Sequence, residues 1–380
     1  MQIQSKLPNV GTTIFSVMSA LANQHNAINL SQGFPNFPTS DKLIDLAASY
    51  MKKGYNQYAP MTGVPILKER IAAKIENMYG KIVHPDNEIT ITVGATQALF
   101  TAIATFVNVG DEVIVFEPAY DSYIPAIEVV GGIAVPYSLK GPDYSPNWEE
   151  VKALITPKTR MIIFNTPHNP TGTTLKAQDF KALEEITKDT DILLLSDEVY
   201  EHLIYDDQEH QSILRYPALF ERSVMTYSFG KTFHKTGWRV GYCIAPPHLM
   251  KEFRKVHQFN VFTIITPIQY ALADFLADPD EYLSLNGFFQ QKRDFLLNAL
   301  KGARLKPLQC EGTYFCLFDY SAVSDETDTA FAKRMTTEYG VASIPVSVFY
   351  SDQRDEKVIR LCFAKTDTTL EKAGALLQKI

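Results

Sequence analysis

Short apolar runs alternate with longer amphipathic stretches through the middle of the chain. The runs predict strands over Ile89–Val93, Glu112–Phe116, Arg160–Asn165, Asp191–Asp197, Ser223–Ser228 and Val240–Ala245. The stretches between them predict helices over Thr96–Val107, Tyr120–Val130 and Lys176–Thr187. Because the strands are apolar without alternation, we expect them to be buried on both faces. The pattern therefore predicts an α/β fold with a mostly parallel central sheet covered by helices.

The two ends of the chain show different patterns. The first forty residues are predicted to be rich in loops, because residues 31–40 hold a glycine and two prolines. Helices are expected next, over Asp41–Lys52 and Val64–Tyr79. The C-terminal part predicts helices over 271–277, 282–300, 329–339 and 369–378, with strands over 314–318 and 358–363. We predict an N-terminal segment (1–45) that joins a smaller α+β domain (271–380), and a large domain (46–270) between them.

Composition narrows the class of protein. The 380 residues are 46% hydrophobic and 21% charged, which is ordinary for a soluble globular protein. A net charge of −7 gives no chain-wide basic surface for nucleic acid. No apolar run reaches the roughly 18 residues of a membrane span, and no secretory leader is expected. The chain has four cysteines that form no C-x-x-C pair, namely Cys243, Cys310, Cys316 and Cys362. This usage favours a reducing compartment and predicts a cytoplasmic location.

Residues suited to ligand binding follow the ends of the predicted strands, where open parallel sheets bind ligands. Asp197 ends an apolar strand, and a carboxylate there needs a cationic partner. Gly94–Gln97 leads into a helix and suits a phosphate, although a plain turn capped by Thr96 is the commoner origin of such a pattern. Asn169 precedes a proline, so its amide either faces a cleft or belongs to a simple turn.

The segment from Ser228 to Arg239 carries a hydroxyl, an amine and a guanidinium around one turn. Its Gly-Lys-Thr tripeptide is similar to the end of a nucleotide-binding P-loop, but Met225 stands where the first glycine would be. Ser228 and Arg239 together suit a phosphate. Lys231, beside such cations, would be a better nucleophile toward a carbonyl, although any single lysine is more often a solvated one.

These positions together favour one ligand. A phosphate, a flat ring for Tyr120 to stack on, a ring nitrogen for Asp197 and an aldehyde for Lys231 are all present in pyridoxal phosphate. Other chemistries are less well supported. The sequence has no H-E-x-x-H and no paired Cys/His spacing, so no metal is predicted. It also lacks a G-x-S-x-G elbow and a G-x-G-x-x-G after a strand.

The chain resembles the class I/II aminotransferases of pyridoxal-phosphate fold type I. The resemblance runs from SQGFPNFP near the start to VIRLCFAK near the end, and its most specific part is SFGKTFHKTGWRVGY (Ser228–Tyr242). NPTG and SDEVY are further marks of the family, while QGFPNFP, NQYAP, EPAYDSY and NTPHNPTG are most similar to its methionine and kynurenine/glutamine members. Gly230 departs from the serine that many relatives carry before the lysine.

The resemblance implies a role for each site residue. Lys231 would hold the cofactor covalently and then move the proton at the substrate α-carbon, while Asp197 would pair with the pyridine nitrogen. The cofactor ring would be contacted by Tyr120, Tyr200 and Asn169. Its phosphate would be held by Ser228, Arg239, the backbone of Ala95 and Thr96, and Tyr58 of the other subunit of a homodimer. The substrate α-carboxylate would be bound by Arg360, Asn169 and the backbone of Gly33.

The expected activity is transfer of the amino group of an apolar or aromatic L-amino acid to a 2-oxo acid by a ping-pong mechanism. Methionine is the first candidate donor, followed by glutamine, phenylalanine, tyrosine and kynurenine. The N-terminal segment, with Ile14 and Phe15, is expected to line the side-chain pocket. Two alternatives remain: a carbon–sulfur β-lyase acting on cysteine conjugates or cystathionine, and a non-catalytic aminotransferase-like regulator. The regulator is less favoured, because family motifs begin by Gln32 and no DNA-binding segment is expected before them.

Overall fold

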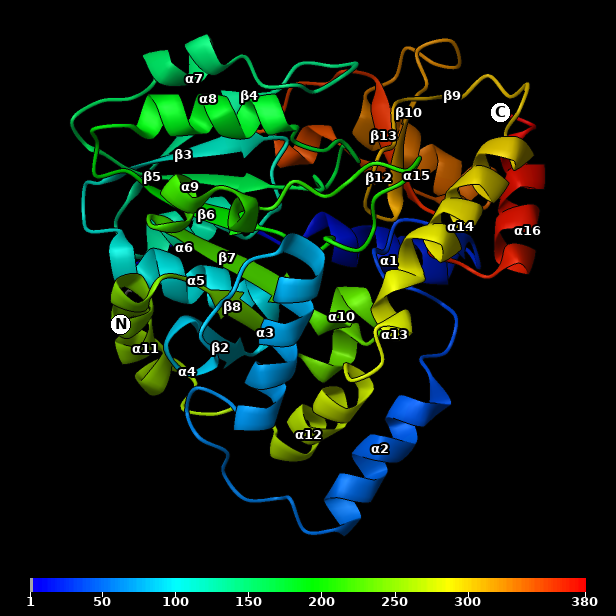
Figure 1. The fold of residues 1–380 in the computed structure, drawn as a ribbon. Coiled ribbons are helices and arrows are strands. Elements are labelled where there is room, and N and C mark those ends of the chain that lie inside the picture. Colours follow the sequence, from blue (N-terminus) through cyan, green and yellow to red (C-terminus); the bar gives the residue numbers. More distant parts are fainter. Residues whose placement is uncertain (1–2) are drawn as a thin grey trace.

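A computed structural model describes residues 3–380 of the chain, and within them a seven-stranded sheet forms the centre of the molecule (Figure 1). The strands lie in the order β2-β8-β7-β6-β5-β3-β4, and β8 alone among them runs antiparallel to its neighbours. Their bounds are Ile89–Thr92 (β2), Glu112–Glu117 (β3), Ile133–Ser138 (β4), Thr159–Asn165 (β5), Leu193–Asp197 (β6), Ser223–Ser228 (β7) and Gly241–Ile244 (β8). The predicted fold class is confirmed.

The central strands are apolar on both faces because each face carries its own core. Ile162 and Leu194 pack into one buried cluster, whereas their neighbours Ile163 and Leu195 pack into the other. Side chains alternate across a strand, so consecutive apolar residues serve opposite layers. This explains why the sequence shows unbroken apolar runs rather than alternation.

Helices cover both layers of the larger sheet (Figure 1). One core receives residues of α5 (Gly94–Phe106), α6 (Tyr123–Val129) and α11 (Pro247–Asn260). The other receives residues of α2 (Asp41–Lys52), α3 (Pro65–Tyr79), α8 (Ala177–Thr187) and α12 (Thr266–Phe275). Shorter helices connect these elements: α4 (Pro85–Glu88), α7 (Trp148–Ala153), α9 (Pro217–Phe220), α10 (Phe229–Thr232) and α13 (Asp280–Leu283).

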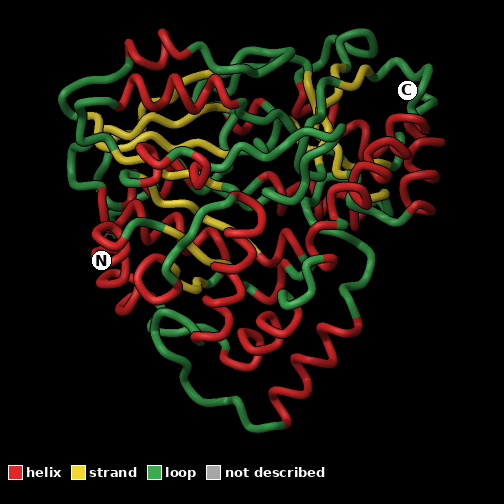
Figure 2. The backbone as a smooth tube through the Cα atoms, viewed as in Figure 1, coloured by secondary structure: helices red, strands yellow, loops and turns green. Residues whose placement is uncertain are grey.

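A second, smaller sheet is built from the C-terminal part of the chain and lies beside the first (Figure 2). It contains β12 (Ile344–Pro345), β13 (Val358–Cys362), β10 (Phe315–Asp319) and β9 (Lys306–Pro307), all antiparallel. Its helices are α14 (Leu285–Ala299), α15 (Asp328–Glu338) and α16 (Asp367–Leu377). The N-terminal segment joins this part, because β1 (Ile28–Asn29) pairs with β11 (Val341–Ala342).

The first forty residues were predicted to be rich in loops, and most of the described ones are, but a helix among them was not predicted. Helix α1 occupies Ile14–Gln24, and the Thr13 hydroxyl accepts a hydrogen bond from the backbone N–H of Ser16. Met18 and Ala22, one turn apart, are buried, and Met18 packs with residues of α15 and β12. The glycine and prolines of residues 31–40 lie beyond the helix, so they give no sign of it.

Other differences are shifts of boundaries. Helix α5 begins at Gly94, which adopts a left-handed φ of +68° and is separated from the end of β2 by Val93 alone. Helix α6 begins at Tyr123, so Tyr120 lies on a loop. The predicted helix over 282–300 is two helices, α13 and α14.

Strand β4 and helices α7 and α11 were not predicted. The domain boundaries remain a prediction.

Within residues 3–380, none of the helices is both long enough and apolar enough to cross a bilayer. In the same residues, no three His, Cys, Asp or Glu side chains gather as a metal ion would require.

Candidate active site

A cavity of about 290 Å³ opens at the carboxyl ends of the strands of the larger sheet. The structure brings every sequence-predicted site residue except Tyr58 to its wall: Gly33, Ala95, Thr96, Tyr120, Asn169, Asp197, Tyr200, Ser228, Lys231, Arg239 and Arg360. Of the two N-terminal residues expected to line the side-chain pocket, Phe15 of α1 lines this cavity and Ile14 does not. The residues come from both sheets and from the N-terminal segment, so the cavity lies where these three parts meet.

Asp197 is the last residue of β6 and is almost completely buried. The Tyr123 hydroxyl donates a hydrogen bond of 2.6 Å to Asp197 Oδ2, and the Val199 backbone N–H donates one of 3.4 Å to Oδ1. Burial raises the pKa of Asp197 to about 6, against the lowering effect of the Tyr123 hydrogen bond. A buried carboxylate of this kind is suited to a cationic partner in the cavity.

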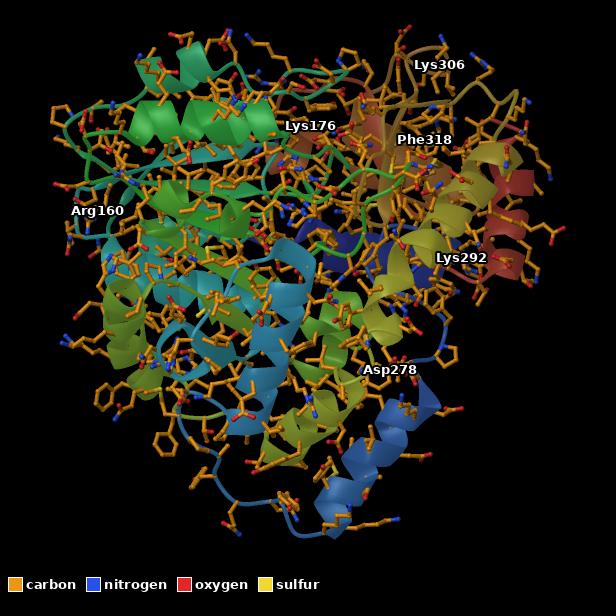
Figure 3. All side chains as sticks on the ribbon, viewed as in Figure 1. Arg160, Lys176, Asp278, Lys292, Lys306 and Phe318 are labelled. Atoms are coloured by element: carbon orange, nitrogen blue, oxygen red, sulfur yellow. The ribbon has the colours of Figure 1, made fainter. Side chains whose placement is uncertain are left out.

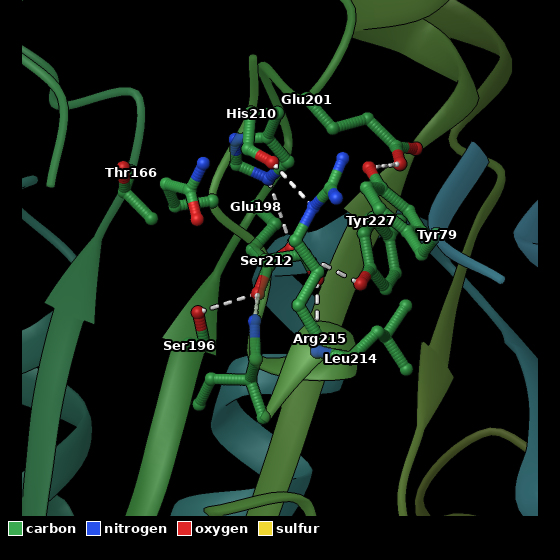
Figure 4. Close-up of polar contacts among 12 residues, drawn as sticks. Tyr79, Thr166, Ser196, Glu198, Glu201, His210, Ser212, Leu214, Arg215 and Tyr227 are labelled. Carbon is green, nitrogen blue, oxygen red and sulfur yellow. Dashed lines mark hydrogen bonds and ion pairs between the residues drawn. The ribbon is translucent and has the colours of Figure 1, made fainter. Parts of the chain in front are cut away.

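Glu198, the residue after Asp197, lies at the centre of a group of polar contacts (Figure 4). Its buried carboxylate accepts hydrogen bonds from the hydroxyls of Ser196 (2.9 Å) and Tyr227 (3.2 Å) and from the backbone N–H of Ile213 (3.2 Å). His210 Nε2 lies 3.0 Å from the same carboxylate. A buried polar network around Glu198 therefore holds the chain directly after Asp197.

Lys231 lies on α10, one turn after the end of β7. Its Nζ is 3.5 Å from the Gly33 carbonyl oxygen and lies over the rings of Tyr200 and Tyr314, at 5.8 Å and 5.6 Å from their centroids. Burial, together with the nearby Arg360 guanidinium, lowers the pKa of Lys231 to about 8. A larger fraction of this amine is therefore uncharged near neutral pH than for a solvated lysine.

A compact group of donors lies beside Lys231. Ser228 ends β7, and Arg239, in a left-handed conformation, donates a 2.9 Å hydrogen bond to the Thr236 carbonyl oxygen. The Arg239 guanidinium packs so closely on Gly94 that a Cβ there would lie 3.0 Å from Nη2. The first turn of α5 and a cation thus face the same space, a combination that suits a phosphate.

Arg360 extends from β13 and is only 1% exposed. Its Nη1 donates a 2.6 Å hydrogen bond to Asn169 Oδ1, its Nη2 donates one of 3.2 Å to the Ser31 carbonyl oxygen, and the guanidinium lies 3.8 Å from the centroid of the Phe315 ring. Burial lowers the pKa of Arg360 to about 10, so it is charged at neutral pH. Its Nε has no hydrogen-bond partner within residues 3–380. The side chain is therefore a buried cation with capacity for an anion.

Tyr58 lies outside the cavity. Its side chain is 81% exposed, and its ring is 5.3 Å from that of Phe262. Together with Thr263–Pro267 it lines a separate surface groove. Tyr58 therefore does not share a cavity with Lys231 and Arg239 of its own chain. Its expected role at another subunit's site stays a prediction.

Sequence reasoning missed several residues of the cavity and its support. Tyr123 follows Tyr120 by three residues in EPAYDSY, the spacing of one turn of the helix predicted there, which was a signal in the sequence. Asn165 ends β5, and its amide connects two predicted residues by donating to the Asp197 carbonyl oxygen (2.7 Å) and accepting from the Asn169 N–H (2.7 Å). Phe315 had no local signal, because its place beneath Arg360 depends on the pairing of β10 with β13.

The residues present fit the cofactor that the sequence suggested. The cavity contains an amine with a lowered pKa (Lys231) and a buried carboxylate (Asp197). It also contains hydrogen-bond donors around Arg239 and Gly94 that suit a phosphate. These groups match the aldehyde, the ring nitrogen and the phosphate of pyridoxal phosphate, respectively.

Known proteins resemble the chain over nearly its whole length. The family described as "Aminotransferase class I and II" matches residues 25–377. Methionine aminotransferase of Escherichia coli (strain K12) is 52% identical over 378 residues, which cover 99% of this chain and 98% of that protein. Kynurenine–oxoglutarate transaminase of Dictyostelium discoideum is 35% identical over 97% of this chain and 94% of that protein. A crystal structure from Escherichia coli, described as identifying a methionine aminotransferase function, has a TM-score of 0.98 with 52% identity and full coverage of both chains.

Proposed function

Because the chain belongs to the class I and II aminotransferases, which depend on pyridoxal phosphate, we propose that it transfers the amino group of an apolar or aromatic L-amino acid to a 2-oxo acid. The family and the enzyme class expected from the sequence are confirmed: the protein is a transaminase and its cofactor is pyridoxal phosphate. We propose methionine as the preferred donor. The names of the Escherichia coli relatives support this choice, and the kynurenine transaminases support a tolerance for aromatic donors.

The cations of the cavity carry this proposal. Within residues 3–380, the cationic side chains that line it are Lys231, Arg239 and Arg360, and each has a place in the reaction. Arg360 would take the substrate α-carboxylate, which leaves none of them for a second, distal carboxylate. The remaining wall near Arg360 includes the rings of Phe15 and Phe315. Such a site favours an apolar side chain over that of aspartate.

The proposed roles follow from the positions of the side chains. Lys231 would bind the cofactor aldehyde and, once free, would carry the proton at the substrate α-carbon. Asp197 would pair with the ring nitrogen, and Ser228 and Arg239 would hold the phosphate with the first turn of α5. Tyr120, Tyr200 and Asn169 would hold the ring. Bound in this cavity, pyridoxal phosphate supplies an electron-withdrawing ring and a carbonyl carbon that exchanges oxygen for the amino group.

A homodimer would complete the site. The support is an exposed apolar surface around Tyr58, which is 81% exposed and lies beside Phe262 and Ile265. Tyr58 belongs to this surface, and we propose that it contacts the phosphate of the cofactor bound in the second subunit. We also propose the division into residues 1–45 with 271–380 and residues 46–270, supported by the pairing of β1 with β11. A cytoplasmic location is proposed because the four cysteines are buried and unpaired.

The test is an absorbance titration of the purified holoenzyme with a panel of L-amino acids and no 2-oxo acid. We expect the long-wavelength band of the bound cofactor to convert to that of its aminated form. Methionine should convert it at the lowest concentration, aromatic amino acids next, and aspartate poorly. The 2-oxo acid formed should equal the enzyme sites in amount, because without an acceptor the reaction stops after one half.

Other outcomes would redirect the proposal. Pyruvate formed from a cysteine conjugate in excess of enzyme sites, without any acceptor, would favour the carbon–sulfur β-lyase. Preferential conversion by aspartate would contradict the assignment of an apolar donor.

A further inference from the structure

The segment Ser31–Phe34 crosses the cavity beside Arg360, and side chains bind each of its four consecutive carbonyl oxygens. The donors are Arg360 Nη2 to Ser31 (3.2 Å), Lys365 Nζ to Gln32 (3.4 Å), the Tyr314 hydroxyl to Gly33 (2.6 Å) and Lys365 Nζ to Phe34 (2.8 Å). These three donor residues belong to the C-terminal part of the chain, and Lys231 Nζ of α10 also lies 3.5 Å from the Gly33 carbonyl oxygen. The segment has no secondary structure of its own, so these bonds determine how its peptide groups are turned.

Lys365 is the unusual member of this group. Its side chain is only 3% exposed, and its ammonium lies 5.0 Å from the centroid of the Phe34 ring. The carbonyl oxygens of Gln32 and Phe34 are its hydrogen-bond partners within residues 3–380, and no carboxylate there forms an ion pair with it. Burying a cation is costly unless polar groups compensate it. The two carbonyl dipoles therefore supply the compensation, and they are held toward the ammonium.

The orientation of one carbonyl fixes that of the next N–H. In a trans peptide the C=O and the N–H point in opposite directions. With the Gln32 carbonyl directed at Lys365, the Gly33 N–H is directed away from Lys365. Gly33 lines the cavity, and its N–H donates to no partner within residues 3–380. It is thus a free donor on the wall that also carries the Arg360 guanidinium.

Gly33 has no freedom to move toward Phe315. A Cβ at this position would lie 2.6 Å and 2.9 Å from two atoms of the Phe315 ring, and that ring also stacks on Arg360. The Phe315 ring therefore contacts both Gly33 and the Arg360 guanidinium, and it limits how the two can move relative to each other. A small rotation of the Gln32–Gly33 peptide would misdirect this donor, and the bonds from Lys365 oppose such a rotation.

We propose that Lys365 is a positioning residue for the substrate α-carboxylate, which it serves by orienting the Gln32–Gly33 peptide so that the Gly33 N–H and Arg360 bind the same carboxylate. This inference rests on the proposed function, in which Arg360 and Gly33 receive that group. Lys365 does not touch the substrate. Its cation turns and polarises the peptide that does.

The experiment compares two ligands of the holoenzyme, L-methionine and 3-(methylthio)propylamine, which is methionine without its carboxylate. Spectral titration of the bound cofactor gives an apparent Kd for each ligand. The Lys365→Met variant should weaken methionine about tenfold while changing the amine less than about twofold, because a charge-assisted interaction that orients a donor is lost. Lys365→Arg should restore most of the methionine affinity, since it keeps the cation.

Lys292→Met is the matched control. Lys292 lies on α14 (Figure 3) and pairs with Asp367 at 2.6 Å, two residues along the chain from Lys365. Its replacement should change neither titration. An equal loss for both ligands in Lys365→Met would indicate a merely structural role and would overturn the inference, as would unchanged binding of both.

An Arg360→Met reference separates this inference from the proposed function. Loss of the preference for methionine over the amine in Arg360→Met, with the preference intact in Lys365→Met, would overturn only the role of Lys365. A wild-type enzyme that does not prefer methionine to the amine would contradict the α-carboxylate site itself.

Discussion

The cavity has two walls that are built in different ways. The first wall belongs to one sheet: Asp197 and Ser228 end adjacent strands, and Lys231 follows within one turn. The second wall carries Arg360 and is assembled from both ends of the chain. The bond from Arg360 to Ser31 joins residues 329 positions apart, and that from Lys365 to Phe34 joins residues 331 apart.

Because the two walls are built differently, we expect them to serve different parts of the function. The residues of the first wall are placed by strands that must form for the molecule to fold, so cofactor binding depends on the core itself. The second wall adds a segment without secondary structure and a helix, α1, which is held by a small apolar cluster. Its residues line the part of the cavity that we propose for the substrate. Changes there should therefore alter the recognition of amino acids and leave the cofactor in place.

The largest effect is expected where the first wall carries the chemistry. Lys231→Ala removes the amine that we propose binds the cofactor aldehyde and moves the proton at the substrate α-carbon. The loss of proton transfer alone should lower kcat by about 10²–10⁴-fold. Steady-state assays with methionine and a 2-oxo acid measure this loss, and reduction with borohydride shows whether cofactor remains covalently bound.

Lys235→Met is the matched control for this prediction. Lys235 is also buried, lies four residues further along and packs on the rings of Phe233, Trp238 and Phe275, but it does not line the cavity. It should retain turnover within a few fold. Full turnover in Lys231→Ala with unchanged circular dichroism would show that the assignment of the catalytic lysine is wrong.

The two walls also differ in how far the sequence predicted them. Asp197 and Asn169 were found because each follows an apolar strand, and the carboxyl ends of parallel strands share one edge. Arg360 was assigned only through the resemblance to a family, since nothing local shows that β13 meets the N-terminal segment. Phe315 and Lys365 were missed for the same physical reason. Their contacts depend on the packing of distant segments, which local propensity and periodicity do not encode.

The second wall should respond through substrate affinity. Arg360→Met removes a buried cation from Asn169 and from the proposed α-carboxylate site, and the loss of such a pair should raise the KM for methionine about a hundredfold. The Kd for pyridoxal phosphate should change little, because Asp197, Ser228 and Arg239 are untouched. Fluorescence titration of the cofactor-free protein measures that Kd.

Arg334→Met serves as the control for Arg360→Met. Arg334 lies on α15, pairs with Glu326 at 2.7 Å and does not line the cavity. Its replacement should leave both the KM for methionine and the Kd for pyridoxal phosphate unchanged. If Arg360→Met weakened cofactor and substrate equally, the two walls would not be separable, and the comparison between them would fail.

The smallest expected effect is a difference in pH dependence between the walls. In the cofactor-free protein, burial raises the pKa of Asp197 from 3.8 to about 6, so the native state binds more protons than the unfolded state between these values. The Asp197 contribution to the free energy of unfolding therefore falls as the pH rises through this window. From pH 5 to pH 7 the fall should be about 1 kcal/mol. Arg360, whose pKa is about 10, stays protonated over the same range.

Urea unfolding of wild type, Asp197→Asn and Arg360→Met at pH 5, 6 and 7 tests this difference. The stability of wild type relative to Asp197→Asn should decrease by about 1 kcal/mol across the series, because the amide does not titrate. The stability of wild type relative to Arg360→Met should be the same at each pH. Parallel curves for wild type and Asp197→Asn would mean that Asp197 is already ionised at pH 5, with Tyr123 and Lys231 stabilising the carboxylate more than burial opposes it. The first wall would then hold its charge as firmly as the second.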